Sequence, residues 1–214
     1  MEASTPAPPP EPPEQPPPPP APPAAAEPYP VRLDAVRQEE YNRFLPLVKW
    51  LLAIPHYIVL ALLALGALVV ILIAFFAILF TGRYPRGLWD YLTGVYRWAN
   101  RVCGYVLLLT DTYPPFSLED DPDYPVRVEL DYPETVDRWR VLQFILIIPY
   151  AIIASILSYL MFAVALIGVF VILFTKALPE GMFKLILIPM RWQLRSNAYA
   201  HTTVTRYPPF EWDD

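Results

Sequence analysis

Two long apolar runs dominate the hydropathy pattern of this chain. No charged residue occurs from Tyr57 to Phe80 or from Tyr150 to Thr175. At about 1.5 Å per residue, the shorter run reaches about 36 Å as a helix, more than a hydrocarbon core of about 30 Å. Pro55 and Pro149 precede the runs and suit the first turn of a helix, where a missing N–H costs nothing. The pattern predicts two transmembrane helices, at about 57–80 and 150–175.

An amphipathic segment follows each apolar run. In the segment at about 88–110, apolar residues recur every three or four positions, while Arg97 and Arg101 fall on the other side. Crossing a bilayer would cost about 2.5–3.5 kcal/mol for each arginine, so we expect this helix to lie in the headgroup plane, with crossing as the alternative. The segment at about 182–198 is predicted to be helical but interrupted by Pro189, and not to cross.

The chain contains an internal repeat. The sequence Tyr29-Pro30-Val31-Arg32-Leu33 recurs as Tyr124-Pro125-Val126-Arg127-Val128, and Tyr113-Pro114-Pro115-Phe116 recurs as Tyr207-Pro208-Pro209-Phe210. These matches define copy one as residues 29–121 and copy two as residues 122–214. If each copy crosses the membrane once, the two copies are inverted and both chain ends lie on the same side. We place the ends in the cytoplasm, because a long acidic tail is then left untranslocated.

That tail, residues 1–28, holds half of the 28 prolines, four glutamates and no basic residue. Such a composition predicts a disordered segment, acting as a stiff spacer or as a polyproline ligand for another protein. The tail accounts for most of the net charge of −5, and no basic excess is present elsewhere. Nucleic acid is therefore not an expected partner. Short strands outside the membrane are predicted at Val126–Leu130 and at His201–Thr205, from their alternation and β-branched residues.

Several stretches of copy one carry a resemblance to a known family. They are Ile54-Pro55-His56-Tyr57, Leu79-Phe80-Thr81-Gly82-Arg83-Tyr84-Pro85-Arg86-Gly87, Arg97-Trp98, and Leu109-Thr110-Asp111-Thr112-Tyr113-Pro114-Pro115-Phe116. With them the chain resembles, over residues 29–214, a bacterial membrane family known as domain of unknown function 4389. The resemblance implies a membrane location and brings no activity. Copy two departs from the pattern, since His56 becomes Tyr150 and Asp111 becomes Thr205.

Basic residues beside the predicted helices are the main candidate site. Cations at a membrane surface gain roughly 1 kcal/mol each from anionic lipids, or simply anchor a helix at its depth. The candidate contacts to lipid headgroups are Arg83, Arg86, Arg97, Arg101, Arg191 and Arg195. His56 is interpreted as an amphipathic residue of the interface, with proton transfer as the alternative. Two histidines and one cysteine, far apart, offer no metal-ligand spacing, and no cofactor is expected.

The sequence thus predicts an all-α integral membrane protein, multi-pass in the cell membrane, with two transmembrane helices, interfacial helices and short extramembrane strands. No nucleophile and base, metal cluster or phosphate loop is evident, so we do not expect an enzyme. A non-enzymatic accessory or scaffold protein that contacts lipid headgroups or a partner complex fits best. The alternatives are a small transporter or channel subunit acting as an oligomer and, third, an enzyme on lipid-linked substrates. Expected partners are the bilayer, anionic lipids, further copies of the chain or another membrane protein.

Overall fold

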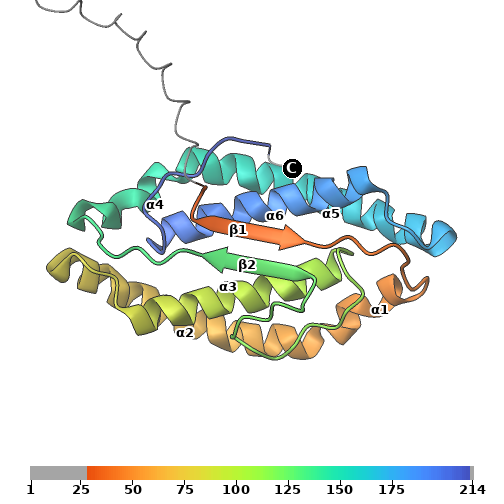
Figure 1. The fold of residues 1–214 in the computed structure, drawn as a ribbon, viewed down its shortest axis with the longest axis horizontal. Coiled ribbons are helices and arrows are strands. Elements are labelled where there is room, and N and C mark those ends of the chain that lie inside the picture. Colours follow the sequence, from red (N-terminus) through yellow and green to blue (C-terminus); the bar gives the residue numbers. More distant parts are fainter. Residues whose placement is uncertain (1–27, 213–214) are drawn as a thin grey trace, which may run out of the picture.

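The computed structural model describes residues 28–212, so nearly all of the predicted proline-rich tail lies outside the described residues. Each copy contributes one strand, a short lead-in segment and a hairpin of two helices (Figure 1). In chain order the elements are β1 (Val31–Ala35), α1 (Leu45–Leu52), α2 (Ile54–Thr81), α3 (Arg86–Val106), β2 (Val126–Leu130), the 3₁₀ turn η1 (Arg138–Leu142), α4 (Gln143–Leu146), α5 (Ile148–Thr175) and α6 (Glu180–Ala200).

Both long apolar helices are present, and each begins slightly before the predicted position. Together with its lead-in, the first covers Leu45–Thr81, and the second covers Ile148–Thr175; both are long and apolar enough to cross a membrane. Each ends on a residue in the left-handed region, Gly82 with φ 69° and Lys176 with φ 58°. Only glycine adopts that conformation without strain, so copy two ends its helix at a small energetic cost.

The second helix of copy two corrects one prediction. Helix α6 runs without a break from Glu180 to Ala200, and Pro189 lies buried inside it. The predicted interruption is therefore wrong. Proline removes one backbone hydrogen bond of the helix. Packing of α6 along α5 compensates for this loss, because tertiary burial rather than intrinsic propensity supplies most helix stability.

The small sheet has one predicted strand and one that the sequence did not indicate. Strand β2 is confirmed, and it pairs antiparallel with β1. The predicted strand at His201–Thr205 is wrong: this segment forms a turn in which the Thr203 hydroxyl donates to the carbonyl of Ala198 at 2.8 Å. In the sheet, Leu33 lies opposite Val128, its own repeat equivalent. A pseudo-two-fold axis relating the copies therefore passes through this pair.

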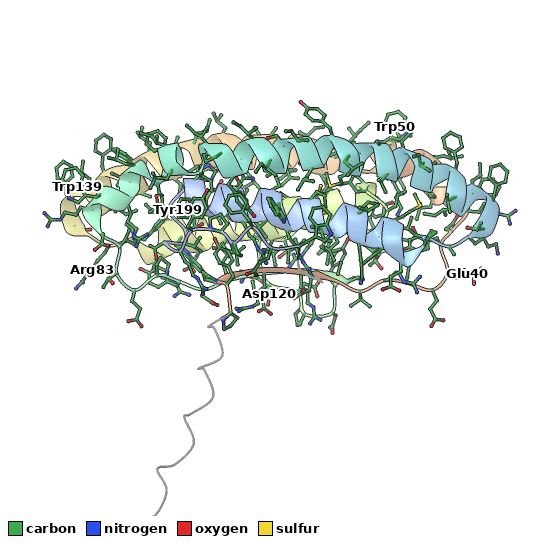
Figure 2. The ribbon with its side chains drawn as sticks, turned by 90° about the horizontal axis from the view of Figure 1, so that it is seen from above. Glu40, Trp50, Arg83, Asp120, Trp139 and Tyr199 are labelled. Atoms are coloured by element: carbon green, nitrogen blue, oxygen red, sulfur yellow. The ribbon has the colours of Figure 1, made fainter. Side chains whose placement is uncertain are left out.

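The elements stack in layers about that axis. The sheet covers one face, α3 and α6 lie beneath it, and α2 and α5 are farthest from it (Figure 2). Helices α2 and α5 run in opposite directions along the long dimension of the molecule (Figure 1). The two copies are thus inverted relative to each other, an arrangement that the sequence predicted on the condition that each copy crosses the membrane once.

The copies exchange their strands. Strand β1 of copy one packs on α6 of copy two, and β2 packs on α3 of copy one. The Arg97 Nε donates to the carbonyl of Val128 at 3.3 Å, and Arg191 Nε donates to that of Leu33 at 2.7 Å. The repeat boundary near residue 121 is therefore a boundary in sequence, whereas each packed unit combines one copy's helices with the other copy's strand.

Candidate membrane interface

One face of the molecule is apolar over its full length. The side chains of α2 and α5 that point away from α3 and α6 are exposed, and they include Ile58, Leu62, Leu65, Leu68, Leu72, Phe76 and Phe80 on α2 and Ile152, Ile156, Phe162, Leu166, Phe170 and Phe174 on α5. Soluble monomers rarely expose a continuous apolar surface of this extent. The two apolar helices favour association with a membrane.

Large aromatic side chains lie at the two ends of this face. The lead-in segments expose Phe44 and Trp50 in copy one, and Trp139 and Phe144 in copy two. Trp50 and Trp139 lie near opposite ends of the molecule (Figure 2). Tryptophan is enriched where hydrocarbon meets water, because its ring is apolar and its N–H is polar.

The opposite face is charged. Arg32 on β1 forms ion pairs across the sheet with Glu129 and Asp131, both at 3.1 Å. Arg191 pairs with Asp34 at 3.1 Å, also at the sheet. Glu40, Asp120 and Arg83 are spread along this same face from one end to the other (Figure 2). The whole molecule is therefore amphipathic, with the sheet on its polar side.

The structure separates the six arginines into two groups. Arg101 is only 2% exposed, and its guanidinium donates to the carbonyls of Ser117 at 3.4 Å and Glu119 at 2.7 Å. Burial lowers the pKa of Arg101, while the nearby Asp121 and Asp120 act in the opposite direction. The guanidinium lies 5.9 Å from the ring centre of Tyr124 of copy two. This arginine holds the loop after α3 and the start of the exchanged strand.

Arg195 occupies the equivalent position in copy two. It is 8% exposed, and its guanidinium lies 5.3 Å from the ring centre of Tyr29. Arg97 and Arg191 bond the strands as described above, so the protein itself engages four of the six guanidinium groups. Arg83 and Arg86 are exposed, although Arg86 also pairs with Asp90 at 3.0 Å. Headgroup contact stays a prediction, and the geometry favours it most for Arg83 and Arg86.

His56 is buried in an aromatic cluster, so its predicted place at the interface is wrong. Its Nδ1 accepts a hydrogen bond from Trp98 Nε1 at 3.0 Å, and its ring stacks on Phe116 at 3.9 Å. In copy two, Tyr150 stacks on Trp192 at 4.8 Å and also contacts Phe210. The repeated Tyr-Pro-Pro-Phe motif thus folds back to cover the first turn of each long helix.

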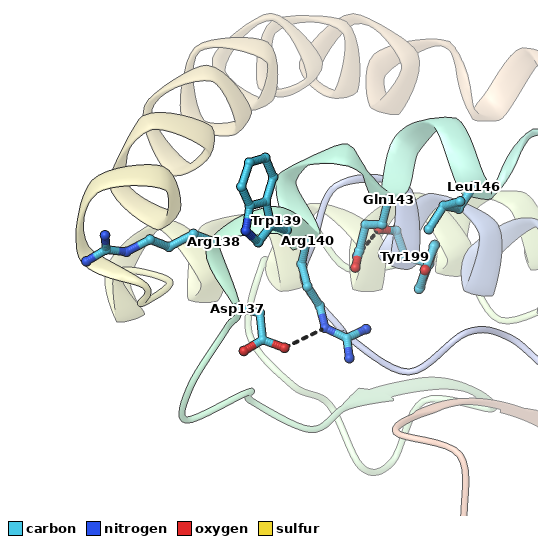
Figure 3. Close-up of a pocket in the computed structure, with 7 residues that line it drawn as sticks. All are labelled: Asp137, Arg138, Trp139, Arg140, Gln143, Leu146 and Tyr199. Carbon is cyan, nitrogen blue, oxygen red and sulfur yellow. Dashed lines mark hydrogen bonds and ion pairs between the residues drawn. The ribbon is translucent and has the colours of Figure 1, made fainter.

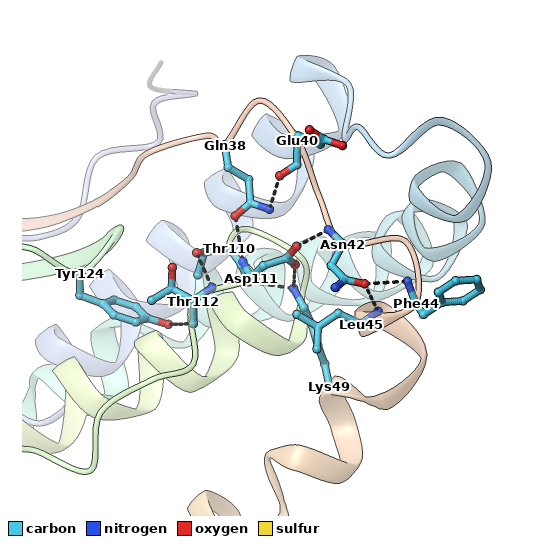
Figure 4. A network of polar contacts seen from close by, with 10 residues as sticks. All are labelled: Gln38, Glu40, Asn42, Phe44, Leu45, Lys49, Thr110, Asp111, Thr112 and Tyr124. Atoms are coloured by element: carbon cyan, nitrogen blue, oxygen red, sulfur yellow. Dashed lines mark hydrogen bonds and ion pairs between the residues drawn. The ribbon is translucent and has the colours of Figure 1, made fainter.

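A buried ion pair lies where α1 meets the end of the copy-one hairpin (Figure 4). Lys49 is 1% exposed, and its ammonium contacts Asp111 at 2.7 Å and the carbonyl of Thr110 at 2.8 Å. Asp111 also accepts the backbone N–H of Asn42 at 2.6 Å, and its own N–H donates to Gln38 at 2.9 Å. The network ties the chain after β1, the lead-in helix and the hairpin end together.

Copy two has a neutral version of the same junction. Gln143 replaces Lys49, is buried, and donates to the carbonyls of Val204 at 2.8 Å and of Tyr199. Thr205 replaces Asp111. Sequence reasoning noted the second replacement and missed the first, although the paired loss of two opposite charges was a usable signal.

Next to Gln143 lies an open pocket of about 500 Å³ (Figure 3). Two arginines and an exposed tryptophan form much of its wall, and its lining residues are Asp137, Arg138, Trp139, Arg140, Gln143, Leu146 and Tyr199. The Arg140 guanidinium pairs with Asp137 at 3.6 Å and donates to the carbonyl of Thr205. An apolar floor beside cationic groups suits a molecule with an acyl part and an anionic part.

These features define a class: a helical protein built from two inverted copies, with one apolar face and a charged sheet opposite. The chain belongs to the family described as Domain of unknown function (DUF4389), which matches residues 46–117 and 140–211. The two matches cover the helical hairpins of the two copies and omit both strands. No curated protein and no solved structure matches the chain.

Proposed function

We propose that this chain is a non-enzymatic accessory or scaffold protein of the cell membrane, in contact with lipid headgroups or a partner complex. The observation that carries the proposal is the continuous apolar face of α2 and α5. Two placements would cover that apolar face with lipid: the helices cross the bilayer, as hydropathy predicts, or they lie along it. With the helices along the bilayer the charged sheet is available to a partner in water, whereas with the helices across it the sheet is available only to a partner within the membrane. We place the chain ends in the cytoplasm.

The first test is membrane extraction. Cell membranes that hold the full chain are washed with alkaline carbonate, and the pellet and supernatant are compared. We expect the protein to stay in the pellet until detergent is added. Burial of the apolar face in lipid contributes more binding free energy than electrostatic attachment of surface charges does. Release by carbonate alone would refute the proposal. As a control, L65K/L166K, which places charge on the apolar face, should weaken retention, whereas E129K/D120K on the sheet face should not.

The second test concerns headgroups at the copy-two pocket. Binding of the purified protein to vesicles with and without anionic lipid is measured for R138Q and for R43Q, its repeat equivalent. We expect R138Q to lower the affinity for anionic vesicles about fivefold, since one cation near the surface contributes roughly 1 kcal/mol. R43Q should have less effect, because the hollow around Arg43 lacks the tryptophan and leucine that line the copy-two pocket and could contact an acyl chain. Equal effects would show that only total charge matters.

A further inference from the structure

The position of the sheet relative to the long helices limits how the molecule can sit in a bilayer. Tyr91 of α3 donates to the carbonyl of Leu63 on α2 at 2.9 Å, and Trp98 reaches His56, so this part of α3 packs against residues 56–63 of α2. Arg97 in the same stretch of α3 binds the carbonyl of Val128 at the centre of the sheet. The sheet therefore lies beside the N-terminal part of α2, near the middle of the longer segment Leu45–Thr81, and the long helices extend beyond it at both ends (Figure 1).

The pseudo-two-fold axis relates this position of the sheet to its depth in a bilayer. The axis passes through the Leu33–Val128 pair and relates two antiparallel helices, so it is perpendicular to both of them. If α2 and α5 stood along the bilayer normal, the axis would lie in the membrane plane, at mid-depth for a symmetric placement. The sheet would then be at the level of the hydrocarbon centre.

Charges on the sheet oppose that placement. The side chains of Glu129 and Asp131 are 56% and 54% exposed, Asp34 is 65% exposed, and Arg32 is 37% exposed. No element among residues 28–212 covers this outer face of the sheet (Figure 2). An ionised side chain at the bilayer centre costs about 2.5–3.5 kcal/mol on insertion scales, and this face would place four of them there.

Turning the molecule by a quarter turn removes the conflict. With the axis along the bilayer normal, all exposed side chains of α2 and α5 face hydrocarbon and the sheet faces water. We propose that the chain is embedded in a single leaflet, with α2 and α5 parallel to the membrane plane and the acyl chains of that leaflet covering their apolar face.

This inference rests on the membrane location proposed above, and its test is the sidedness of the polar face. Cysteine is placed at Glu40, Asp120 or Arg83 in a C103S background, which removes the single native thiol. Glu40 and Arg83 lie near opposite ends of the molecule, on the sheet face (Figure 2). Sealed vesicles of known orientation are treated with a membrane-impermeant maleimide, with permeabilised vesicles as the reference for full labelling.

In a single leaflet all three cysteines are on one side, so E40C, D120C and R83C label to the same extent from that side and not from the other. In a crossing arrangement E40C and R83C label from opposite sides, which would overturn the inference. The proposed function would survive that result as long as the protein still resists carbonate. Release by carbonate would instead refute the proposed function, so the two failures are distinguishable.

Depth measurements give an independent readout. Spin labels at I58C, L65C and L72C sit seven residues apart on the exposed side of α2. Their depth in vesicles is measured from collisions with oxygen and with a water-soluble relaxant. We expect equal depths, whereas a helix along the normal would separate the first and last labels by about 21 Å. Different depths, or labels shielded from both relaxants by a second copy or another protein, would overturn the inference.

Discussion

A buried carbonyl at the end of each hairpin accepts a hydrogen bond from a different kind of side chain in the two copies. In copy one, Lys49 reaches the carbonyl of Thr110 and neutralises Asp111. In copy two, Gln143 reaches the equivalent carbonyl of Val204 with no charge involved. The lead-in segment needs a donor at this position to satisfy a buried carbonyl, and either an ammonium or an amide can supply it. The ion pair is therefore a feature of copy one and not a requirement of the fold.

Breaking the ion pair should produce the largest effect. K49M removes the cation and leaves the Asp111 carboxylate and the Thr110 carbonyl without it. Truncating one partner of a buried pair typically costs about 3–5 kcal/mol, and we expect about 3 kcal/mol because Asp111 keeps 17% exposure. The check is thermal and denaturant unfolding of the purified protein in detergent.

Copy two supplies the matched control. K49Q/D111T installs the copy-two residues and should recover stability to within about 1 kcal/mol of the native protein, since replacing both partners of a buried pair is often neutral. Q143M in copy two also leaves a carbonyl unsatisfied but no charge, so we expect about 1–3 kcal/mol. If K49Q/D111T were as unstable as K49M, the ion pair itself would be required.

The arginines that hold the loops allow a second comparison. Arg101 donates to the carbonyls of Ser117 at 3.4 Å and Glu119 at 2.7 Å, and a short charge-assisted hydrogen bond such as the second contributes about 1.5–3 kcal/mol. We expect R101M to lower the unfolding free energy by about 2 kcal/mol and to release the loop after α3. A protease that cleaves after glutamate should then cut at Glu119 faster than in the native protein.

R195M is the control for that experiment. Arg195 is the repeat equivalent of Arg101 on α6, and its guanidinium lies against Tyr29, just before β1. R195M should therefore lower stability without faster cleavage at Glu119. Equal cleavage in both variants would mean that the loop opens only by global unfolding, and that Arg101 does not hold it locally.

The sequence predicts the features of the fold that depend on local residue patterns, and misses those that depend on contacts between distant residues. The two apolar helices, the repeat and strand β2 follow from residue patterns along the chain, whereas the inversion of the copies was predicted only for one membrane crossing per copy. The pairing of β2 with β1 was missed because both strands are short copies of one motif, and nothing local shows that a motif pairs with its own repeat. The turn at His201–Thr205 was misassigned because its β-branched residues bond back to the end of α6.

The predicted roles of the arginines also failed to include contacts with residues distant in sequence. Arg97 and Arg101 were assigned to the polar side of an amphipathic helix, which is correct, and that side was taken to face headgroups. It faces the exchanged strand and its loop, because packing partners distant in sequence cover it. Hydropathy similarly counts every face of α2, although its inner side is packed on α3 and only the outer side is available to lipid.

The smallest predicted effect is the pH dependence that His201 contributes. His201 follows α6, and its Nδ1 lies 2.6 Å from the Tyr96 hydroxyl; its repeat equivalent is the buried Leu107. Burial lowers the pKa of His201 below 6.5, so the folded state favours the neutral ring. Below about pH 6.5 the unfolded chain binds a proton that the folded chain excludes, and the folded state is destabilised as the pH falls. Above that pH the contribution is complete and constant.

Unfolding free energy measured from pH 8 to pH 5 should thus be flat at first and then decline, by no more than about 1.4 kcal/mol per pH unit from this group. The variant H201L, which installs the copy-one residue, removes the titrating ring and should make the decline shallower, the remainder being left to other groups such as the buried His56. Its stability at pH 8 is the reference, because loss of the Tyr96 contact affects all pH values alike. A decline in H201L as steep as in the native protein would assign the pH dependence to another group.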